Sequence, residues 1–330
     1  MQPDPNDPDL AWPLSVGEPG REVWYSLVSP HDGSLAFWYR YTLLSTADGL
    51  QEGRLWAALT DHENPENSQF VTESYPFEEV WPDSDPFGLT IGDGALTSSS
   101  ATGTIGDVSW ELDYEPDTYA FTPLRSETLT NLLSAILGTG KHWSRNQSVF
   151  MSGEITVGDR TIELDDAPGH QGHTLSSNPP EEWTWVQCND FENSDAVLEA
   201  LRLDDKLSLC FRTDGEVYAL NRLKHVLTIS PSANSITHDE PGHWRFRGEG
   251  EGIELQATIE ADPDHWQTVA YMAPDDTPRY NAHCSLSDAT VTYSIDGGTT
   301  ETITSDAARA EWVNTDPPVG EAADYRPTWD

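Results

Sequence analysis

The sequence of 330 residues predicts an all-β protein made of two consecutive antiparallel β-barrels with little helix. Short runs in which apolar and polar residues alternate recur along the chain, and this alternation is typical of strands with one buried face. Five Asp-Gly pairs, which favour tight hairpin turns, separate several of these runs. Helical patterning is limited to residues 126–137 and one further turn at 195–202. A chain of this length can bury two cores.

The spacing of the runs predicts both the strands and the domain boundaries. In chain order, we expect strands at 21–28, 35–44, 54–60, 107–114, 149–157, 160–164, 182–190, 208–212, 216–221, 244–247, 252–260, 267–272, 284–294 and 300–304. The expected parts are an acidic, Pro-rich arm over 1–19, a first barrel over 20–155, a second barrel over 156–315 and an acidic tail over 316–330.

The strand at 182–190 carries an unusual face. With a period of two, Trp183, Trp185, Gln187 and Asn189 point to one side, and small residues point to the other. Two indoles followed by two amides are typical of an aromatic ligand pocket, although Trp-rich strands also occur in ordinary β cores. Just upstream, His170 and His173 are expected in a Gly-rich turn leaning over the same face.

This region resembles a known superfamily. The run Gly169-His170-x-x-His173, followed by Trp183-x-Trp185-x-x-x-Asn189-x-Phe191, is similar to the signature of AttH-like proteins, which include carotenoid 1,2-hydratases (hydroxyneurosporene synthases), tocopherol-cyclase-like proteins and some fungal pericyclases. Further segments that are similar to the family's strands, in the family's order, are 34–41, 108–112, 152–157 and 307–312. The resemblance implies two lipocalin-like barrels. It departs at Leu175-Ser176, where the family often has Trp-Gly.

The resemblance also implies a reaction class. Alkene hydration or cation-driven cyclisation needs a proton donor, apolar walls and aromatic faces that tolerate positive charge. His173 with Glu111 or Asp190 would supply the acid–base groups. The expected substrate-binding residues are Trp38, Arg40, Trp110, His170, Trp183, Trp185, Gln187 and Asn189.

Arg40 shares a strand face with Trp38 and therefore needs a carboxylate partner or solvent. Glu111 or Asp113, on one face of the strand at 107–114, would fit. A buried ion pair that only braces the fold and a functional role are both open at this point.

Charge is the other strong signal. The chain has 57 Asp+Glu against 17 Lys+Arg, a formal net charge of −40, and the acids are spread along the whole sequence. Such a surface repels itself unless salt screens it, so we expect a halophilic protein in a high-salt cytoplasm. Metal chelation or a cationic partner are alternatives, but neither needs acids everywhere. A nucleic-acid or anionic-membrane surface is disfavoured.

Other classes are disfavoured by what the sequence lacks. It has three cysteines without a C-x-x-C spacing, no phosphate loop, no dinucleotide fingerprint, no signal-peptide pattern and no long apolar run. We therefore expect no cofactor, no metal and no transmembrane segment, in a monomer or weak homo-oligomer.

Three interpretations stay open. The first is a hydratase, cyclase or isomerase that acts on a hydrophobic isoprenoid- or polyketide-like molecule. The second is a non-catalytic lipocalin-like carrier of such a ligand, which needs the aromatic lining but no acid–base group. The third is a structural protein whose aromatic residues are only core.

Overall fold

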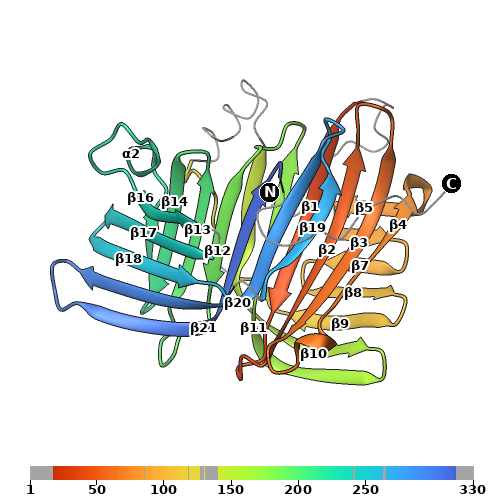
Figure 1. The fold of residues 1–330 in the computed structure, drawn as a ribbon, viewed down its shortest axis with the longest axis horizontal. Helices are drawn as coiled ribbons and strands as arrows, with labels where there is room; N and C mark the ends of the chain where they lie inside the picture. The colour runs from red at the N-terminus through yellow and green to blue at the C-terminus, as the bar shows by residue number, and fades with distance from the viewer. Residues whose placement is uncertain are drawn as a thin grey trace.

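Two curled antiparallel sheets account for most of the chain (Figure 1). The computed structural model describes residues 18–316, except for 85, 118, 127–129, 131–139, 241 and 263–264. The expected all-β class with two successive sheets is confirmed. The helix expected at 126–137 lies almost wholly outside the described residues, and α2 (Leu223–Val226) is a single turn.

The first sheet has eleven strands in the order β4-β3-β2-β1-β11-β10-β9-β8-β7-β6-β5. They are β1 (Gly20–Val28), β2 (Leu35–Ser45), β3 (Gln51–Asp61), β4 (Gln69–Pro76), β5 (Val80–Ser84), β6 (Phe87–Ile91), β7 (Gly94–Thr97), β8 (Ser100–Ile105), β9 (Val108–Tyr114), β10 (Lys141–Val157) and β11 (Arg160–Ser176). Two 3-10 turns, η1 (Pro65–Asn67) and η2 (Phe77–Glu79), flank β4.

The second sheet has ten strands in the order β15-β14-β13-β12-β21-β20-β18-β17-β16, with β19 also paired to β20. They are β12 (Trp183–Cys188), β13 (Val197–Leu203), β14 (Lys206–Thr213), β15 (Glu216–Leu220), β16 (Ser235–Glu240), β17 (His243–Gly250), β18 (Ile253–Glu260), β19 (Gln267–Met272), β20 (Pro278–Ile295) and β21 (Glu301–Asn314).

The chain passes between the sheets later than expected. The expected boundary at 155/156 lies inside β10, which forms one long hairpin with β11. Because β11 also pairs with β1, both strands of this hairpin belong to the first sheet. The sheets therefore divide at residues 177–182, between Ser176 and Trp183.

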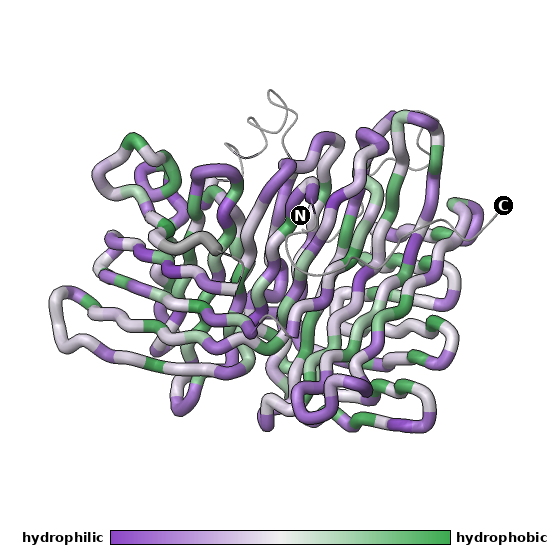
Figure 2. The backbone as a smooth tube through the Cα atoms, viewed as in Figure 1, coloured by the Kyte–Doolittle hydropathy of each residue, from purple (hydrophilic) through white to green (hydrophobic). Residues whose placement is uncertain are grey.

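Strand alternation builds one core per sheet and a third apolar layer where the sheets meet. In β1, Trp24 and Val28 point into the first core, whereas Tyr25 and Leu27 point toward the second sheet. We call this third layer the intersheet layer; its buried apolar members are Val23, Tyr25, Leu27, Trp38, Trp56, Ala58, Phe121, Trp185, Leu201, Cys210, Val269, Tyr271 and Val313. Figure 2 shows hydrophilic segments at many of the outer hairpin turns, away from this layer.

The helical turn expected at 195–202 is wrong, because residues 197–202 belong to β13 and residues 195–196 are not helical. Leu198 and Ala200 pack in the second core, while Leu201 packs in the intersheet layer. A strand that is buried on both faces loses its alternation and reads like a short helix. Among the described residues, no helix has the length and apolar composition of a membrane span.

Candidate functional site

Two buried carboxylates lie on the intersheet side of the second sheet, one on each side of β12. Glu199 is on β13 and Glu311 is on β21, the two neighbours of β12. Trp185 Nε1 donates to Glu199 Oε1 over 2.9 Å, and Trp183 Nε1 donates to Glu311 Oε1 over 2.8 Å. The expected common face of the two indoles is therefore present, and each indole N–H binds a different carboxylate.

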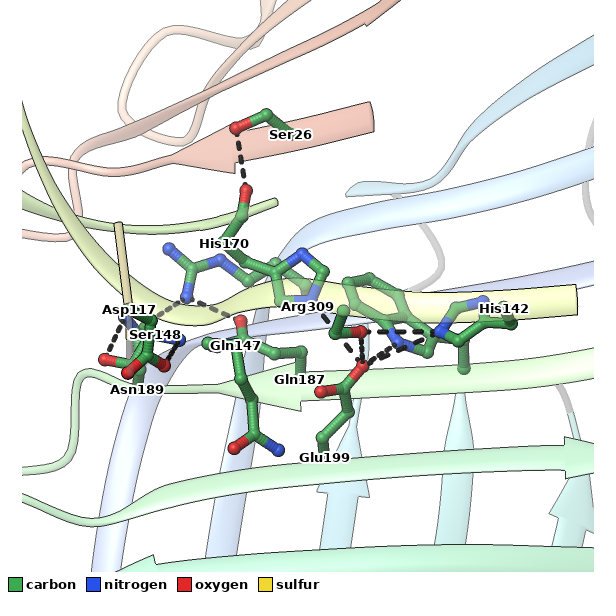
Figure 3. Close-up of polar contacts among 12 residues, drawn as sticks. Ser26, Asp117, His142, Gln147, Ser148, His170, Gln187, Asn189, Glu199 and Arg309 are labelled. Atoms are coloured by element: carbon green, nitrogen blue, oxygen red, sulfur yellow. Dashed lines mark hydrogen bonds and ion pairs between the residues drawn. The ribbon is translucent and has the colours of Figure 1, made fainter. Parts of the chain in front are cut away.

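Glu199 joins the two sheets through residues of β10 and β11. Ser144 Oγ donates a hydrogen bond to Glu199 Oε1. The same oxygen lies 3.5 Å from His170 Nε2 and 3.9 Å from His142 Nε2 (Figure 3). Glu199, His170 and Ser144 have no exposed surface, and the His142 side chain is 13% exposed. We call Glu199, Ser144, His142, His170 and Trp185 the Glu199 cluster.

The electrostatics fix the charge state of this cluster. Burial by itself would raise the pKa of Glu199, but its contacts with the His142 and His170 imidazoles outweigh burial and lower this pKa to about 2. Burial lowers the pKa of His170, against the opposing effect of Glu199. The resting state is therefore an ionised carboxylate beside a neutral His170 imidazole.

Aromatic rings enclose the cluster. The Tyr25 ring stacks on His170 with a centroid distance of 5.6 Å, and it meets Trp185 edge-on at 5.7 Å. Burial, followed by the charges of Glu199 and Glu311, raises the pKa of Tyr25 well above its usual value, so its hydroxyl stays protonated. A Cβ at Gly172 would come within 2.3 Å of the Tyr25 ring, so only glycine allows this close approach.

Glu311 is the second buried carboxylate on the intersheet side of the second sheet. Its Oε2 accepts hydrogen bonds from Arg40 Nη2 at 2.6 Å and from Asn281 Nδ2 at 2.7 Å. The Arg40 guanidinium carbon lies 4.2 Å from the centre of the Trp38 ring. Burial raises the pKa of Glu311, but Arg40 and the other neighbours lower it below its usual value, so the carboxylate is ionised.

The expected partners of Arg40, Glu111 and Asp113, are not its partners. Both are exposed on β9, which lies four strands away from β2 in the first sheet. Glu111 is therefore separated from the Glu199 cluster as well. β9 does meet β2 across the first core, through Trp110 and Tyr39, but Glu111 and Asp113 point outward to solvent, whereas Arg40 points to the intersheet layer.

The amides of the expected pocket bind a buried arginine instead of facing open space. Arg309 Nη1 donates to Gln187 Oε1 at 3.0 Å and to Asn189 Oδ1 at 2.6 Å (Figure 3). Its Nη2 donates to the Pro168 carbonyl at 3.0 Å and to Ser29 Oγ at 3.4 Å. Arg309 thus ties β21 and β12 to the first sheet, and we call these contacts the Arg309 clamp.

The two histidines expected in a turn lie within β11, and strand alternation places them on opposite faces. His170 faces Trp185, with ring centroids 4.9 Å apart. His173 faces the first sheet's interior, where it stacks between Trp24 and Trp143 at 4.7 and 5.1 Å. Its Nε2 lies 2.7 Å from Glu22 Oε1. The structure therefore separates His173 from the two indoles.

Two further expected site residues lie elsewhere. Asp190 follows β12 near the surface, with Oδ1 3.6 Å from His31 Nδ1. Trp110 is buried in the first core and stacks on Tyr39 at 5.8 Å. Of the residues expected to bind substrate, the structure brings Trp38, Arg40, His170, Trp183 and Trp185 to the intersheet layer.

Sequence reasoning missed most of the acid–base groups. Glu199 is the only charged residue in the apolar run 197–201, and Arg309 alternates with Glu311 among small residues on β21. An isolated charge in an apolar strand is a signal of a buried polar site. His142 and Ser144 carried no comparable signal.

Two further kinds of site, a metal site and a surface pocket, are the alternatives to the Glu199 cluster in the described residues. Among the described residues, no group of three or more His, Cys, Asp or Glu is arranged to hold a metal ion. A surface hollow of about 400 Å³ lies apart from the Glu199 cluster, lined by Leu124, Arg125, Ser126, Asn221, Arg222 and Leu223. That hollow contains no acid–base pair, so the candidate site remains the intersheet layer.

Solved structures share this fold over nearly the whole chain. CghA, determined with Sch210972, matches with a TM-score of 0.57 and 13% identity over 95% of this chain and 97% of its own. A proposed AttH from Nitrosomonas europaea matches with a TM-score of 0.58 and 14% identity over 94% and 97%. Kievitone hydratase from Nectria haematococca matches with a TM-score of 0.53 and 12% identity over 94% and 97%.

No protein-family model and no curated protein sequence matches the chain. At these identities the structural matches show the fold alone. The double lipocalin-like fold implied by the sequence motifs is confirmed by them.

Proposed function

We propose that this protein is a cofactor-independent hydratase, cyclase or isomerase that acts by acid–base chemistry on a hydrophobic, isoprenoid- or polyketide-like molecule. The Glu199 cluster would be its active site. The observation that carries this proposal is a fully buried carboxylate, Glu199, that lies 3.5 and 3.9 Å from two imidazole nitrogens inside an aromatic layer. The likeness in fold to a protein named kievitone hydratase supports a hydratase among these reactions.

His170 is the proton carrier in this proposal. Its neutral imidazole takes up a proton, and the neighbouring Glu199 carboxylate stabilises the imidazolium that forms. The imidazolium then protonates one carbon of a substrate double bond, which leaves a carbocation at the other carbon. Trp185 and Tyr25 present aromatic surfaces next to His170, and such surfaces stabilise positive charge.

The carbocation then decides the product. Addition of water followed by loss of one proton to the imidazole gives net hydration. Attack by a second double bond closes a ring and moves the positive charge to another carbon, and loss of a proton from that cation to the imidazole completes a cyclisation. Direct loss of a different proton from the first carbocation to the imidazole gives an isomerisation. Neither outcome changes the mass. His142 is the partly exposed member of the cluster, so it would connect the cluster to solvent. Its Nε2 lies 3.4 Å from Ser144 Oγ, which leads on to Glu199.

Substrate would enter past the segment 115–126 (residue 118 apart), which is the first part of the connection from β9 to β10 and crosses to the second sheet. Asp117 Oδ2 pairs with Arg212 Nη1 at 2.7 Å, and the Pro123 carbonyl accepts a hydrogen bond from Ser208 Oγ at 2.6 Å. Phe121 lies in the intersheet layer beside His142. We call this segment the strap; its opening would expose the Glu199 cluster.

The experiment is a turnover screen of olefinic isoprenoids and polyketides in molar KCl, with mass spectrometry to detect gain of one water or formation of an isomer. Glu199→Gln and His170→Asn should each lower the rate by about 10²–10⁴, the usual contribution of a positioned acid–base group. His243→Asn is the matched control, because His243 pairs with Glu260 at 3.4 Å on the surface. Equal rates in the three variants would contradict the proposal.

The carrier alternative predicts a different outcome. A carrier needs the aromatic lining but no ionised carboxylate next to an imidazole. Ligands would then bind without any change in mass or structure, and Glu199→Gln would leave affinity unchanged. The placement of Glu199 beside the His142 and His170 imidazoles favours the enzyme, because a carrier needs no acid–base pair in its lining.

The high-salt setting remains part of the proposal. Sixteen of the 17 Lys+Arg lie in the described residues, and four of these sixteen are buried, namely Arg40, Arg54, Arg279 and Arg309. The accessible surface is therefore poorer in cations than the sequence composition suggests. Screening by salt would relieve the repulsion among the surface carboxylates.

A further inference from the structure

Several buried polar atoms next to the Arg40–Glu311 pair have no hydrogen-bond partner within the part of the protein that the structure describes. They are Trp38 Nε1, Arg40 Nε, Asn281 Oδ1 and His283 Nδ1. Their residues are 2–7% exposed. Because buried polar groups are nearly always hydrogen-bonded, four such atoms around one ion pair call for an explanation.

The four residues that carry these atoms lie next to one another at one spot in the intersheet layer. Arg40 and Asn281 donate to the same oxygen of Glu311. The Arg40 guanidinium lies over the Trp38 ring, and the Trp38 and His283 ring centres are 5.9 Å apart. The spot therefore offers two N–H donors, one carbonyl acceptor and one imidazole nitrogen.

His283 contributes as a neutral group. Burial lowers the pKa of His283 to about 4, and its Nε2 lies 2.8 Å from Ser285 Oγ. Its Nδ1 can then accept or donate a hydrogen bond according to the tautomer. A neutral imidazole beside the Arg40–Glu311 pair, whose two charges balance each other, suits an uncharged oxygen group better than a second ion.

We infer that Trp38, Arg40, Asn281 and His283 form a head-group subsite that binds a hydroxyl or carbonyl oxygen attached to an apolar ring system. This inference rests on the proposed function and deepens it. The Glu199 cluster would perform the chemistry on the apolar body, while the subsite holds the oxygen at the opposite end. A pure hydrocarbon leaves the four atoms unpaired, so the subsite selects oxygenated substrates over bare polyenes.

The test compares 2-naphthol with naphthalene, two ring systems that differ by one hydroxyl, by calorimetry in molar KCl. Wild-type protein should bind 2-naphthol at least about tenfold more tightly, because a site built for a hydroxyl discriminates against the analogue that lacks it. Trp38→Phe keeps an aromatic ring but removes the N–H. It should weaken 2-naphthol binding about fivefold and leave naphthalene binding within about twofold.

His283→Phe is the second variant, which keeps a flat ring and removes Nδ1, so the test does not depend on one substitution folding well. Trp81→Phe is the control, since Trp81 is 57% exposed on β5. Equal binding of both probes by wild-type protein, no binding of 2-naphthol, or parallel weakening of both probes in both subsite variants would each overturn the subsite. Ordered water in place of a ligand oxygen would give the first of these results.

Failure of the subsite and failure of the proposed function are distinguishable. Glu199→Gln should abolish turnover but retain the preference for 2-naphthol, because Glu199 does not contact the four atoms. Unchanged turnover in that variant would contradict the function alone. Loss of the preference in wild-type protein with intact turnover would contradict the subsite alone.

Discussion

Arg309→Met should destabilise the protein more than any surface substitution, because it breaks the clamp between the sheets. Arg309 is fully buried and donates four hydrogen bonds, to Gln187, Asn189, Ser29 and the Pro168 carbonyl. Methionine keeps the apolar length of the side chain but none of its donors. The buried amide oxygens of Gln187 and Asn189 then lose their partner.

The size of the effect follows from these contacts. Each buried acceptor left without a partner costs about 1–3 kcal/mol, so the two amides alone give about 2–6 kcal/mol. Relief from burying a guanidinium offsets part of this, because burial already lowers the pKa of Arg309. We therefore expect a loss of about 3 kcal/mol in the free energy of unfolding.

Urea unfolding followed by tryptophan fluorescence in molar KCl measures this loss. Arg247→Met is the matched control, because Arg247 pairs with Glu254 at 2.8 Å with both side chains more than half exposed. The control should lose less than about 1 kcal/mol. A loss below about 1 kcal/mol for Arg309→Met would refute the clamp as a bond between the sheets.

Four other predictions follow. Gly172→Ala should cost about 1–3 kcal/mol, because its Cβ would clash with Tyr25, whereas Gly88→Ala has its nearest contact at 3.9 Å and should cost less; equal unfolding midpoints would contradict this. His283 has a pKa lowered to about 4, so the native state binds fewer protons than the unfolded chain below pH 6.5, and stability falls as pH drops toward 4. Between pH 6.5 and 5 the free energy of unfolding of wild-type protein should fall by about 2 kcal/mol more than that of His283→Phe. Parallel plots of unfolding free energy against pH for the two proteins would show that His283 is not the cause of the fall. Asp117→Asn should weaken the attachment of the strap to the second sheet by about 2 kcal/mol, which faster hydrogen exchange at 119–126 would show. Unchanged exchange would mean that the ion pair between Asp117 and Arg212 does not hold the strap closed. Thermal midpoints should rise strongly from dilute buffer to several molar KCl, and a flat response would remove the halophilic interpretation.

Period-two alternation was enough to predict the class of fold and many of the strands. It failed where both faces of a strand are buried, as in β13, and where glycines serve close packing instead of turns. Gly172 is the clearest case, since the glycine makes room for the Tyr25 ring in the middle of β11. A turn and a strand with close neighbours look alike in a single sequence.

The candidate site was predictable only in part, for a topological reason. Alternation within β12 predicted that Trp183 and Trp185 share one face, and in the structure their indole N–H groups both bind carboxylates on that side. The two carboxylates that they bind come from β13 and β21, and only the strand order shows that these flank β12. The choice of His173 over His170 failed because a segment read as a turn has no fixed faces, whereas in a strand these two residues point to opposite sides.

The most direct test of the central claim is a crystal structure with a substrate or product from the turnover screen. The reacting carbon should lie in the intersheet layer, within hydrogen-bond reach of His170 and against the face of Trp185. A ligand bound inside the first sheet beside His173 and Glu22, or in the surface hollow lined by Arg125, would contradict the claim.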